Sequence, residues 1–328
     1  MGLYDRPLPM ETTALMFGQW LSVIKRRECA SIVSLPRFDR HYRVAQFLGS
    51  IDDQTRKSYH FVPIFLQSFV TEIWDELKRK ISALKHSTKY TVFLVTDAEW
   101  LLTAAGHLIP NFQEFVLMPY RNCSFLLFFE KNVLDQSFST LTQTCPTLLQ
   151  NVIYQTLYTS EDIDHYIQHM AGVYGCAFSS RDRQAVWEMC GGYIWLVTEA
   201  IRNLHKRGEL IFDHPEMKMR LKAIWDGFSN EEQGVLRTIV RNQAVEDERR
   251  QCLEYFQQTQ LILEVQGKLR IIVPILARYV QENDVSELVL RLDETGEIFS
   301  GATRVTAIFT KKQQDLIRYL LAHKKEIL

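Results

Sequence analysis

Short apolar runs alternate with amphipathic stretches over the first half of this 328-residue chain. Runs this short, apolar without alternation, are typical of strands buried on both faces of a sheet. The pattern therefore predicts an α/β fold, a parallel sheet covered by helices, with its clearest helix over Phe69–Leu84. The predicted strands are Ala30–Leu35, Tyr59–Leu66, Thr91–Thr96, Ser124–Phe129 and, as a fifth, Asn151–Tyr158.

From Ser160 onward the apolar spacing is helical only. Ser160 is followed by acids at positions 161, 162 and 164, which predicts a helix capped by Ser160 with carboxylates in its first turn. We expect a small bundle of the kind that forms a lid over a nucleotide site. Its predicted helices are Ser160–Tyr174, Ser180–Cys190 and Tyr193–His205.

A third unit begins near Phe228. Ser229 caps a predicted helix that runs to Arg241, and a second helix follows over Arg249–Gln258. Two β-rich runs then flank a turn, and Pro274 starts a last helix through Tyr279. Helices followed by a two-stranded wing describe a winged helix. The two runs are Leu261–Val265 and Leu269–Val273, around Gln266-Gly267-Lys268.

The final segment has strand patterns at 288–293 and 302–309, a turn at Gly296 and an amphipathic helix from Thr310. The predicted organisation is a P-loop NTPase-like core at 1–157, a helical lid at 158–227, a winged helix at 228–284 and a fourth unit at 285–328.

The composition argues against several classes of protein but does not indicate a particular function. Hydrophobic residues make up 46% of the chain, and the formal net charge of −1 argues against a generally basic nucleic-acid coat. The six cysteines never form C-x-x-C, so we expect reduced thiols rather than a disulfide framework or a zinc knuckle. We find no signal peptide and no apolar run of ~20 residues, and expect a cytoplasmic protein without membrane contact.

The segment after the first predicted strand has the place of a phosphate-binding loop. Such a loop reads G-x-x-x-x-G-K-[ST], because glycines let backbone N–H groups approach the phosphates, lysine supplies charge and the hydroxyl holds Mg²⁺. Here Ser34 and Asp39 replace the glycines, Arg40 replaces the lysine, and His41 replaces the hydroxyl residue. Asp39 also brings negative charge toward the phosphates. We therefore expect weak ATP binding or none, with Arg40 as a surviving phosphate contact or the loop retained for its shape alone.

Two acids follow the predicted strand Thr91–Thr96. Asp97 comes directly after it and Glu99 two residues later. Carboxylates at this place bind Mg²⁺ and activate water in phosphoryl-transfer sites. Asp97 is thus the candidate metal ligand, and both acids are the candidate catalytic residues of an active enzyme. An acid that ends a strand is also a common helix cap, so both interpretations of Asp97 stay open.

The order of these features resembles the STAND branch of AAA-like ATPases, which are regulatory proteins with a nucleotide core, a helical lid and a winged helix. The resemblance covers about Ala14–Gln281. It includes SFLLFFEKN, which brings Asn132 to a sensor-like position, the lid start LYTSEDI, and Gly191-Gly192-Tyr193-Ile194. The family usually has proline beside the nucleotide where this chain has Ile194. The resemblance implies ATP or ADP with Mg²⁺ as cofactor, and the altered motifs imply that hydrolysis is weakened or lost.

The last segment resembles the beginning of an OmpR-type winged helix-turn-helix. Residues 301–328 hold six Lys or Arg against two acids, which suits a surface facing DNA phosphates, with Lys311, Lys312 and Arg318 as candidate contacts. The later helix that would enter the major groove is absent, so either the module is truncated, which we favour, or the resemblance is accidental. The winged helix is balanced, with seven basic and eight acidic residues, which favours a packing or lever role, although Arg249–Gln258 could read bases.

These features favour a signal-responsive regulatory protein, a transcription regulator that reaches DNA through its C-terminal module, with the degenerate nucleotide site as a conformational switch or scaffold. One alternative is an active ATPase of the STAND or origin-recognition type, and another is a protein-interaction scaffold without nucleotide or DNA. A homo-oligomer fits the first interpretation. His165 and His169 have the i, i+4 spacing of a metal pair, but no third ligand with suitable spacing follows.

Overall fold

The computed structural model describes residues 10–38, 40–66, 89–101, 123–133, 146–283, 290–293, 295–300, 303–304, 306 and 309–322. The predicted helix Phe69–Leu84 and residue Asp39 lie outside these ranges. The chain divides into two compact units, Met1–Arg278 and Tyr279–Leu328, and each is described by itself.

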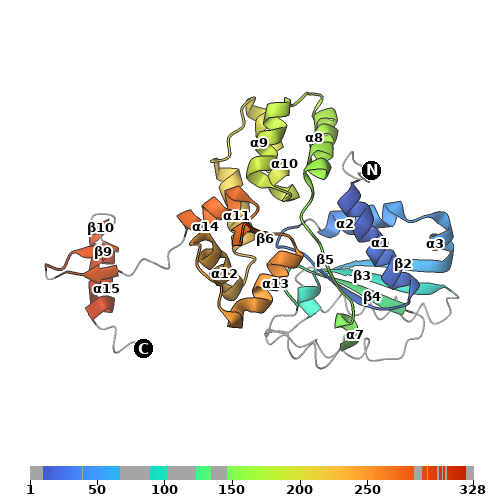
Figure 1. Ribbon diagram of the computed structural model, residues 1–328, viewed down its shortest axis with the longest axis horizontal. Coiled ribbons are helices and arrows are strands. Elements are labelled where there is room, and N and C mark those ends of the chain that lie inside the picture. Colours follow the sequence, from blue (N-terminus) through green and yellow to red (C-terminus); the bar gives the residue numbers. More distant parts are fainter. Residues whose placement is uncertain are drawn as a thin grey trace. The chain divides into compact units, whose positions relative to one another are not determined.

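The first unit is built on a five-stranded parallel sheet (Figure 1). The strands lie in the order β2-β3-β4-β1-β5, and every neighbouring pair is parallel. β1 and β3 are buried along their whole length, as their continuous apolar sequences require. The predicted α/β class and all five strands are confirmed, although the last is shorter than expected. The strands are β1 (Ala30–Val33), β2 (Tyr59–Phe65), β3 (Tyr90–Thr96), β4 (Cys123–Phe129) and β5 (Val152–Tyr154).

Helices α1 (Glu11–Lys25) and α2 (Arg40–Ser50) cover one face of this sheet and form its core with it. Trp20 is fully buried at the centre, with ring centroids 5.1 Å from Phe47 of α2 and 5.0 Å from Phe128 of β4. Both pairs are edge-to-face, the arrangement that aromatic rings prefer. Among the described residues, the connections between strands also include the short elements α3 (Asp53–Ser58), the 3-10 helix η2 (Ala98–Leu101) and α7 (Pro146–Leu149).

Four helices follow the sheet, and α8, α9 and α10 pack against one another (Figure 1). The prediction that Ser160 caps α8 is wrong: the cap is Thr159, whose Oγ1 accepts a hydrogen bond from the Asp162 N–H at 3.2 Å. The fourth helix was not predicted, although Pro215 in its first turn and the capping residue His214 mark its start. The helices are α8 (Ser160–Tyr174), α9 (Ser180–Cys190), α10 (Ile194–Arg207) and α11 (Pro215–Trp225).

The Asp162 carboxylate of α8 also caps α1. The N-cap residue of α1, Met10, makes no side-chain cap. Instead, Asp162 Oδ1 accepts from the Glu11 N–H at 2.9 Å, and Oδ2 accepts from the Thr12 N–H at 3.3 Å. A carboxylate at this place satisfies free N–H groups and is favoured by the helix dipole. The first helix after the sheet is therefore fixed to the first helix of the core.

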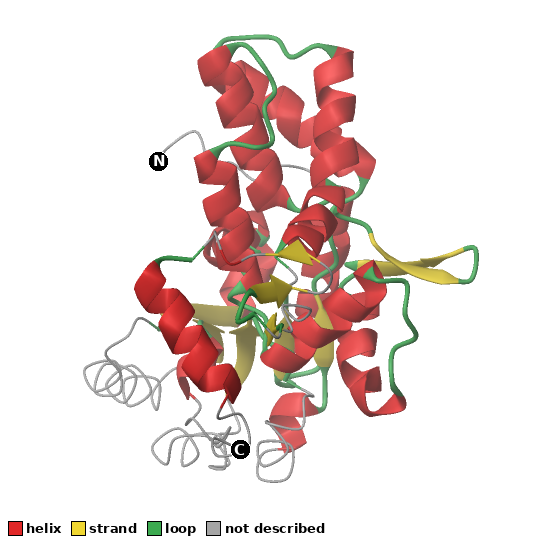
Figure 2. Ribbon diagram, turned by 90° about the vertical axis from the view of Figure 1, so that its left-hand side faces the viewer, coloured by secondary structure: helices red, strands yellow, loops and turns green. Residues whose placement is uncertain are grey.

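The predicted third group of elements is present. Ser229 forms a complete capping box with Glu232 at the start of α12. The hairpin turn contains only Gln266 and Gly267, at φ 54° and 73°, so Lys268 belongs to the second strand and not to the turn. This hairpin projects from the unit (Figure 2). The elements are α12 (Asn230–Val240), the 3-10 helix η4 (Asp247–Arg249), α13 (Arg250–Gln258), β6 (Ile262–Val265), β7 (Lys268–Ile271) and α14 (Pro274–Glu282).

The described part of the second unit contains a small antiparallel sheet in the order β10-β9-β8 and the helix α15. Gly296 lies in a turn at φ 79°, as predicted. The middle strand β9 was missed because its residues were assigned to the connection between two longer runs. Among the helices of the described ranges, none has both the length and the apolar character of a membrane span. The elements are β8 (Leu290–Leu292), β9 (Ile298–Ser300), β10 (Thr303–Arg304) and α15 (Lys311–Ala322).

Candidate functional site at the carboxyl edge of the sheet

The sheet order brings the predicted nucleotide motifs to one edge. β4 lies between β1 and β3, and all three strands run parallel, so their carboxyl ends meet. Ser34 follows β1, Asp97 follows β3, and Asn132 lies three residues after β4. All three side chains are buried, at 2%, 9% and 2% exposure. This edge is therefore the candidate functional site.

The loop after β1 is tied back to the sheet. The backbone N–H and the hydroxyl of Ser34 both donate to the Phe129 carbonyl, at 2.9 and 3.2 Å. Arg37 has a left-handed backbone at φ 58°, and Pro36 has no N–H to offer. A loop that cradles phosphate needs several inward N–H groups. Here the Ser34 N–H already donates to the sheet, and Pro36 has no N–H, so two of those groups are not available to a phosphate.

Two tyrosines from outside the sheet domain bind the carbonyl oxygens of this loop. The Tyr255 hydroxyl of α13 donates to the Ser34 carbonyl at 2.9 Å, and the Tyr193 hydroxyl, at the N-cap of α10, donates to the Pro36 carbonyl. We call these two residues the tyrosine clasp. Both are fully buried, and burial raises the pKa of each well above 10, so both hydroxyls keep their protons. The clasp thus joins β1 to α10 and α13.

Aromatic rings fill the space beside the clasp. Phe38, at the end of the loop, is buried and stacks on Tyr158 with centroids 5.6 Å apart, and its ring meets Tyr193 edge-on at 5.9 Å. The Arg43 guanidinium lies 4.5 Å from the Tyr158 ring centroid and donates to Thr13 at 3.3 Å. The side of the loop that turns toward α10 is therefore packed with protein side chains.

The paired glycines before α10 have a steric reason. A Cβ on Gly192 would lie 2.1 Å from the Tyr158 carbonyl oxygen, and one on Gly191 would lie 2.8 Å from the Ile272 carbonyl oxygen. Gly191 also has φ 52°, a conformation that suits glycine. Ile194, which the resemblance placed beside a nucleotide, begins α10 and is 4% exposed. This motif thus lets α10 approach Tyr158 closely.

The two acids after β3 are held by neighbouring groups. Asp97 has φ 57°, and its Oδ2 accepts from the Thr96 hydroxyl at 3.2 Å. Glu99 Oε1 accepts from the Glu130 N–H, which links η2 to the end of β4. Within the described ranges, no three His, Cys, Asp or Glu side chains are grouped so that they could hold a metal ion. The predicted metal role of Asp97 stays a prediction.

Helix α13 covers part of this edge. Its Gln251 carbonyl accepts from the Asn132 side-chain amide at 3.4 Å. The residue after the helix, Thr259, accepts from the Leu157 N–H at 3.0 Å, and Tyr255 forms the clasp. Cys252, Tyr255 and Phe256 form its buried face. These contacts support the packing role that the charge balance favoured, because α13 is fixed to the core at several points.

The remaining predicted site residues are dispersed. Asp39 is outside the described residues, and of Arg40 and His41 only the backbone, in the first turn of α2, is described. Lys311 and Lys312 are exposed on α15, whereas Arg318 Nε donates to the Gly296 carbonyl at 2.9 Å. Arg318 therefore contributes to the fold of its own unit.

The sequence reading missed Tyr158, Tyr193 and Tyr255 as site residues. Tyr193 belongs to the motif Gly191-Gly192-Tyr193-Ile194, in which only Ile194 was predicted to lie beside a nucleotide. Tyr255 had no local signal, because its partner Ser34 lies 221 positions away. A side chain that acts through such a contact cannot be found from spacing.

No family model and no curated protein matches the chain. Among solved structures, it is similar to a Walker-type ATPase of Pyrococcus abyssi, with a TM-score of 0.55 at 10% identity over 85% of this chain and 100% of that one. It is also similar to the ORC2 protein of Aeropyrum pernix in its ADPNP-ADP complexes, with a TM-score of 0.47 at 10% identity over 83% and 94%. The similarity to domain III of the Thermotoga maritima replication initiation protein DnaA has a TM-score of 0.44 at 13% identity, over 67% of this chain and 93% of that one.

The first of these similarities, together with the five-stranded parallel sheet, shows that the chain has the fold of a P-loop ATPase. At 10% identity it shows the fold alone.

Proposed function

We propose that this protein is a regulatory protein that uses the P-loop ATPase fold as a conformational scaffold, with the phosphate loop held by its own side chains. The tyrosine clasp is the observation that carries the proposal. It binds two loop carbonyls from α10 and α13 at the edge where the resemblance implies nucleotide. In this function, closing and opening of these helices on the loop is the working step, and ATP hydrolysis is not.

The energetics suit a switch. Opening the clasp breaks two buried hydrogen bonds, each with a net value of about 0.5–1.5 kcal/mol, and separates Phe38 from its edge-on contact with Tyr193. A partner that binds the open form shifts the equilibrium by its difference in affinity for the two forms. A closed form favoured by a few kcal/mol is within reach of an ordinary protein partner.

Calorimetric titration with ATP and ADP, with and without Mg²⁺, tests the proposal. We expect a Kd weaker than about 100 μM, which corresponds to less than about 5.5 kcal/mol of binding free energy. The phenylalanine variants of the clasp serve as controls, because they remove the hydroxyls while keeping the rings. Sub-micromolar, Mg²⁺-dependent binding of ATP by the native protein would overturn the proposal.

A second candidate function is an active ATPase with unusual ligands. It is favoured by Asp97 and Asn132, which are buried at the ends of neighbouring strands. Turnover measured with the native protein and with Asp97→Asn separates the two functions. ATP hydrolysis that Asp97→Asn abolishes would support the ATPase, and its absence in both proteins supports the scaffold.

The regulatory output proposed here is transcription, through DNA contact by the second unit. Lys311 and Lys312, exposed on α15, would attract phosphates, so binding should weaken steeply with salt and vary little with sequence. Titration of specific and scrambled duplexes at two salt concentrations tests this, with the Lys311→Gln and Lys312→Gln double variant beside the native protein. A protein whose melting temperature responds to neither nucleotide nor DNA would instead be a protein-interaction scaffold.

A further inference from the structure

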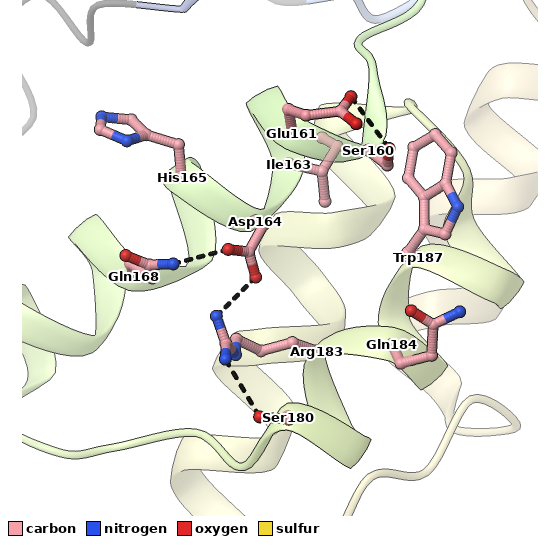
Figure 3. Close-up of a pocket in the computed structure, with 10 residues that line it drawn as sticks. All are labelled: Ser160, Glu161, Ile163, Asp164, His165, Gln168, Ser180, Arg183, Gln184 and Trp187. Carbon is pink, nitrogen blue, oxygen red and sulfur yellow. Dashed lines mark hydrogen bonds and ion pairs between the residues drawn. The ribbon is translucent and has the colours of Figure 1, made fainter.

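A groove lies between α8 and α9, on helices that the clasp does not use (Figure 3). It consists of two adjoining cavities of about 530 Å³ each, and Gln168 and Arg183 line both. The first cavity has a polar lining and includes the indole of Trp187. The second is mainly apolar and includes Ile167, Ala171, Gly172 and Phe178.

The polar groups on the floor of the first cavity neutralise one another. Arg183 Nη1 lies 2.6 Å from Asp164 Oδ1, and Arg183 Nη2 donates to the Ser180 hydroxyl at 3.2 Å. The second oxygen of Asp164 accepts from the Gln168 amide at 2.5 Å. Figure 3 shows this chain of contacts running across the cavity. The guanidinium is thus engaged at both ends, so the cavity is poorly suited to an anion.

Glu161 remains as the uncompensated charge of this cavity. Its carboxylate accepts from the Ser160 hydroxyl at 3.0 Å, and within the described part of the chain no cationic side chain pairs with it. Helices α8 and α9 carry five carboxylates against two arginines, so the surrounding field is also negative. An exposed carboxylate beside the indole of Trp187 is a combination that recognises ammonium or guanidinium groups.

The second cavity lies further along α8 than the first, so a ligand that fills both runs along this helix. A Cβ placed on Gly172 would meet nothing within 4 Å, so the surface at this second cavity is open. The two cavities are displaced along α8 by about seven residues, or roughly 10 Å. A peptide in the polyproline II conformation rises about 3.1 Å per residue with three residues per turn, so residues three positions apart lie on the same face and about 9 Å apart. A cationic side chain and an apolar one, three positions apart, would therefore reach one cavity each.

We propose that this groove binds a segment of a partner protein in the polyproline II conformation, with a lysine or arginine side chain between Glu161 and Trp187 and an apolar side chain against Ala171 and Phe178. The site is independent of the phosphate loop, since none of its residues contributes to the clasp. It gives the regulatory scaffold a place for a partner on α8, the helix whose Asp162 also caps α1. The partner is a protein rather than a small amine, because one amine would leave the apolar cavity empty.

Fluorescence anisotropy of a labelled peptide mixture tests the site. The probe is a fluorescein-labelled heptapeptide with lysine at position 2, leucine at position 5 and mixed residues elsewhere, titrated with the full-length protein. Matched mixtures carry acetyl-lysine at position 2 or serine at position 5. We expect saturable binding of the first mixture, weakened about threefold or more by either change. Acetyl-lysine removes the exposed ion pair and the cation–π contact, and serine removes the burial of the apolar side chain.

Variants of the protein give the second arm. Glu161→Gln and Trp187→Ala should each weaken binding about threefold to fivefold. Glu188→Gln removes the same charge from α9 outside the cavity lining and should leave the Kd within about twofold. Glu161 is exposed and lies in the first turn of α8, so its variant should lower the melting temperature only slightly. Absence of saturable binding, equal binding of the acetyl-lysine mixture, or an equal loss in Glu188→Gln would overturn the proposal.

Discussion

Replacing Tyr255 with phenylalanine removes one hydroxyl from the tyrosine clasp and leaves its ring in place. The hydroxyl donates to the Ser34 carbonyl at 2.9 Å, and both residues are fully buried. Loss of such a bond costs about 0.5–1.5 kcal/mol, and a buried carbonyl left without a donor raises the cost to about 1–3 kcal/mol. We therefore expect the free energy of unfolding to fall by about 1–3 kcal/mol. With an m-value of roughly 3 kcal/mol/M, the urea midpoint would fall by about 0.3–1 M.

Tyr154→Phe is the matched control. Its ring centroid lies 6.4 Å from that of Tyr255, the residue is half-buried, and its hydroxyl makes no hydrogen bond to the described residues. It should cost no more than about 0.5 kcal/mol. Tyr193→Phe should resemble Tyr255→Phe, and the double variant should show coupling, because both hydroxyls hold the same loop. If Tyr255→Phe lost no more stability than Tyr154→Phe, the reasoning on the clasp would be refuted.

Three further predictions concern the contacts around the site. Gly192→Ala should destabilise the protein by several kcal/mol, because its Cβ would lie 2.1 Å from a backbone oxygen. Gly172→Ala, in open space on α8, should be neutral or stabilising by up to ~1 kcal/mol, and thermal unfolding compares the two variants. Asp162→Ala should cost about 1–2 kcal/mol and increase hydrogen exchange in the first turn of α1, and unchanged exchange there would contradict its capping role. The folded state holds the clasp protons more tightly than the unfolded state, so the contribution of the two clasp hydroxyls to the free energy of unfolding should be constant below about pH 10 and fall as the pH rises above it. Alkaline unfolding of the native protein should be steeper than that of the double phenylalanine variant, and equal slopes would count against the buried hydroxyls.

Local sequence determined most of the helices and strands of this fold, although α11 and β9 were missed. Runs such as Thr91–Thr96 are apolar without interruption, and burial on both faces of a sheet is the only way to remove all of those side chains from water. Ser229 predicted a helix start, and the structure completes it as a capping box with Glu232, only three positions away. The departures from the phosphate-loop pattern were equally visible, since that motif is a continuous segment. Each of these inferences depends on interactions within a few residues.

The tertiary structure decided how these elements form a site. The strand order that places β4 between β1 and β3 arises from chain crossovers, which spacing does not encode. Asp162 looked like an ordinary first-turn acid of its own helix, yet its carboxylate caps α1. Tyr255 carried no local signal within the predicted helix Arg249–Gln258, and only folding brought its hydroxyl to Ser34. Hydrogen bonds between distant segments are chosen by the packing of whole elements, so sequence specified which surfaces were buried, and the fold specified which polar groups met inside them.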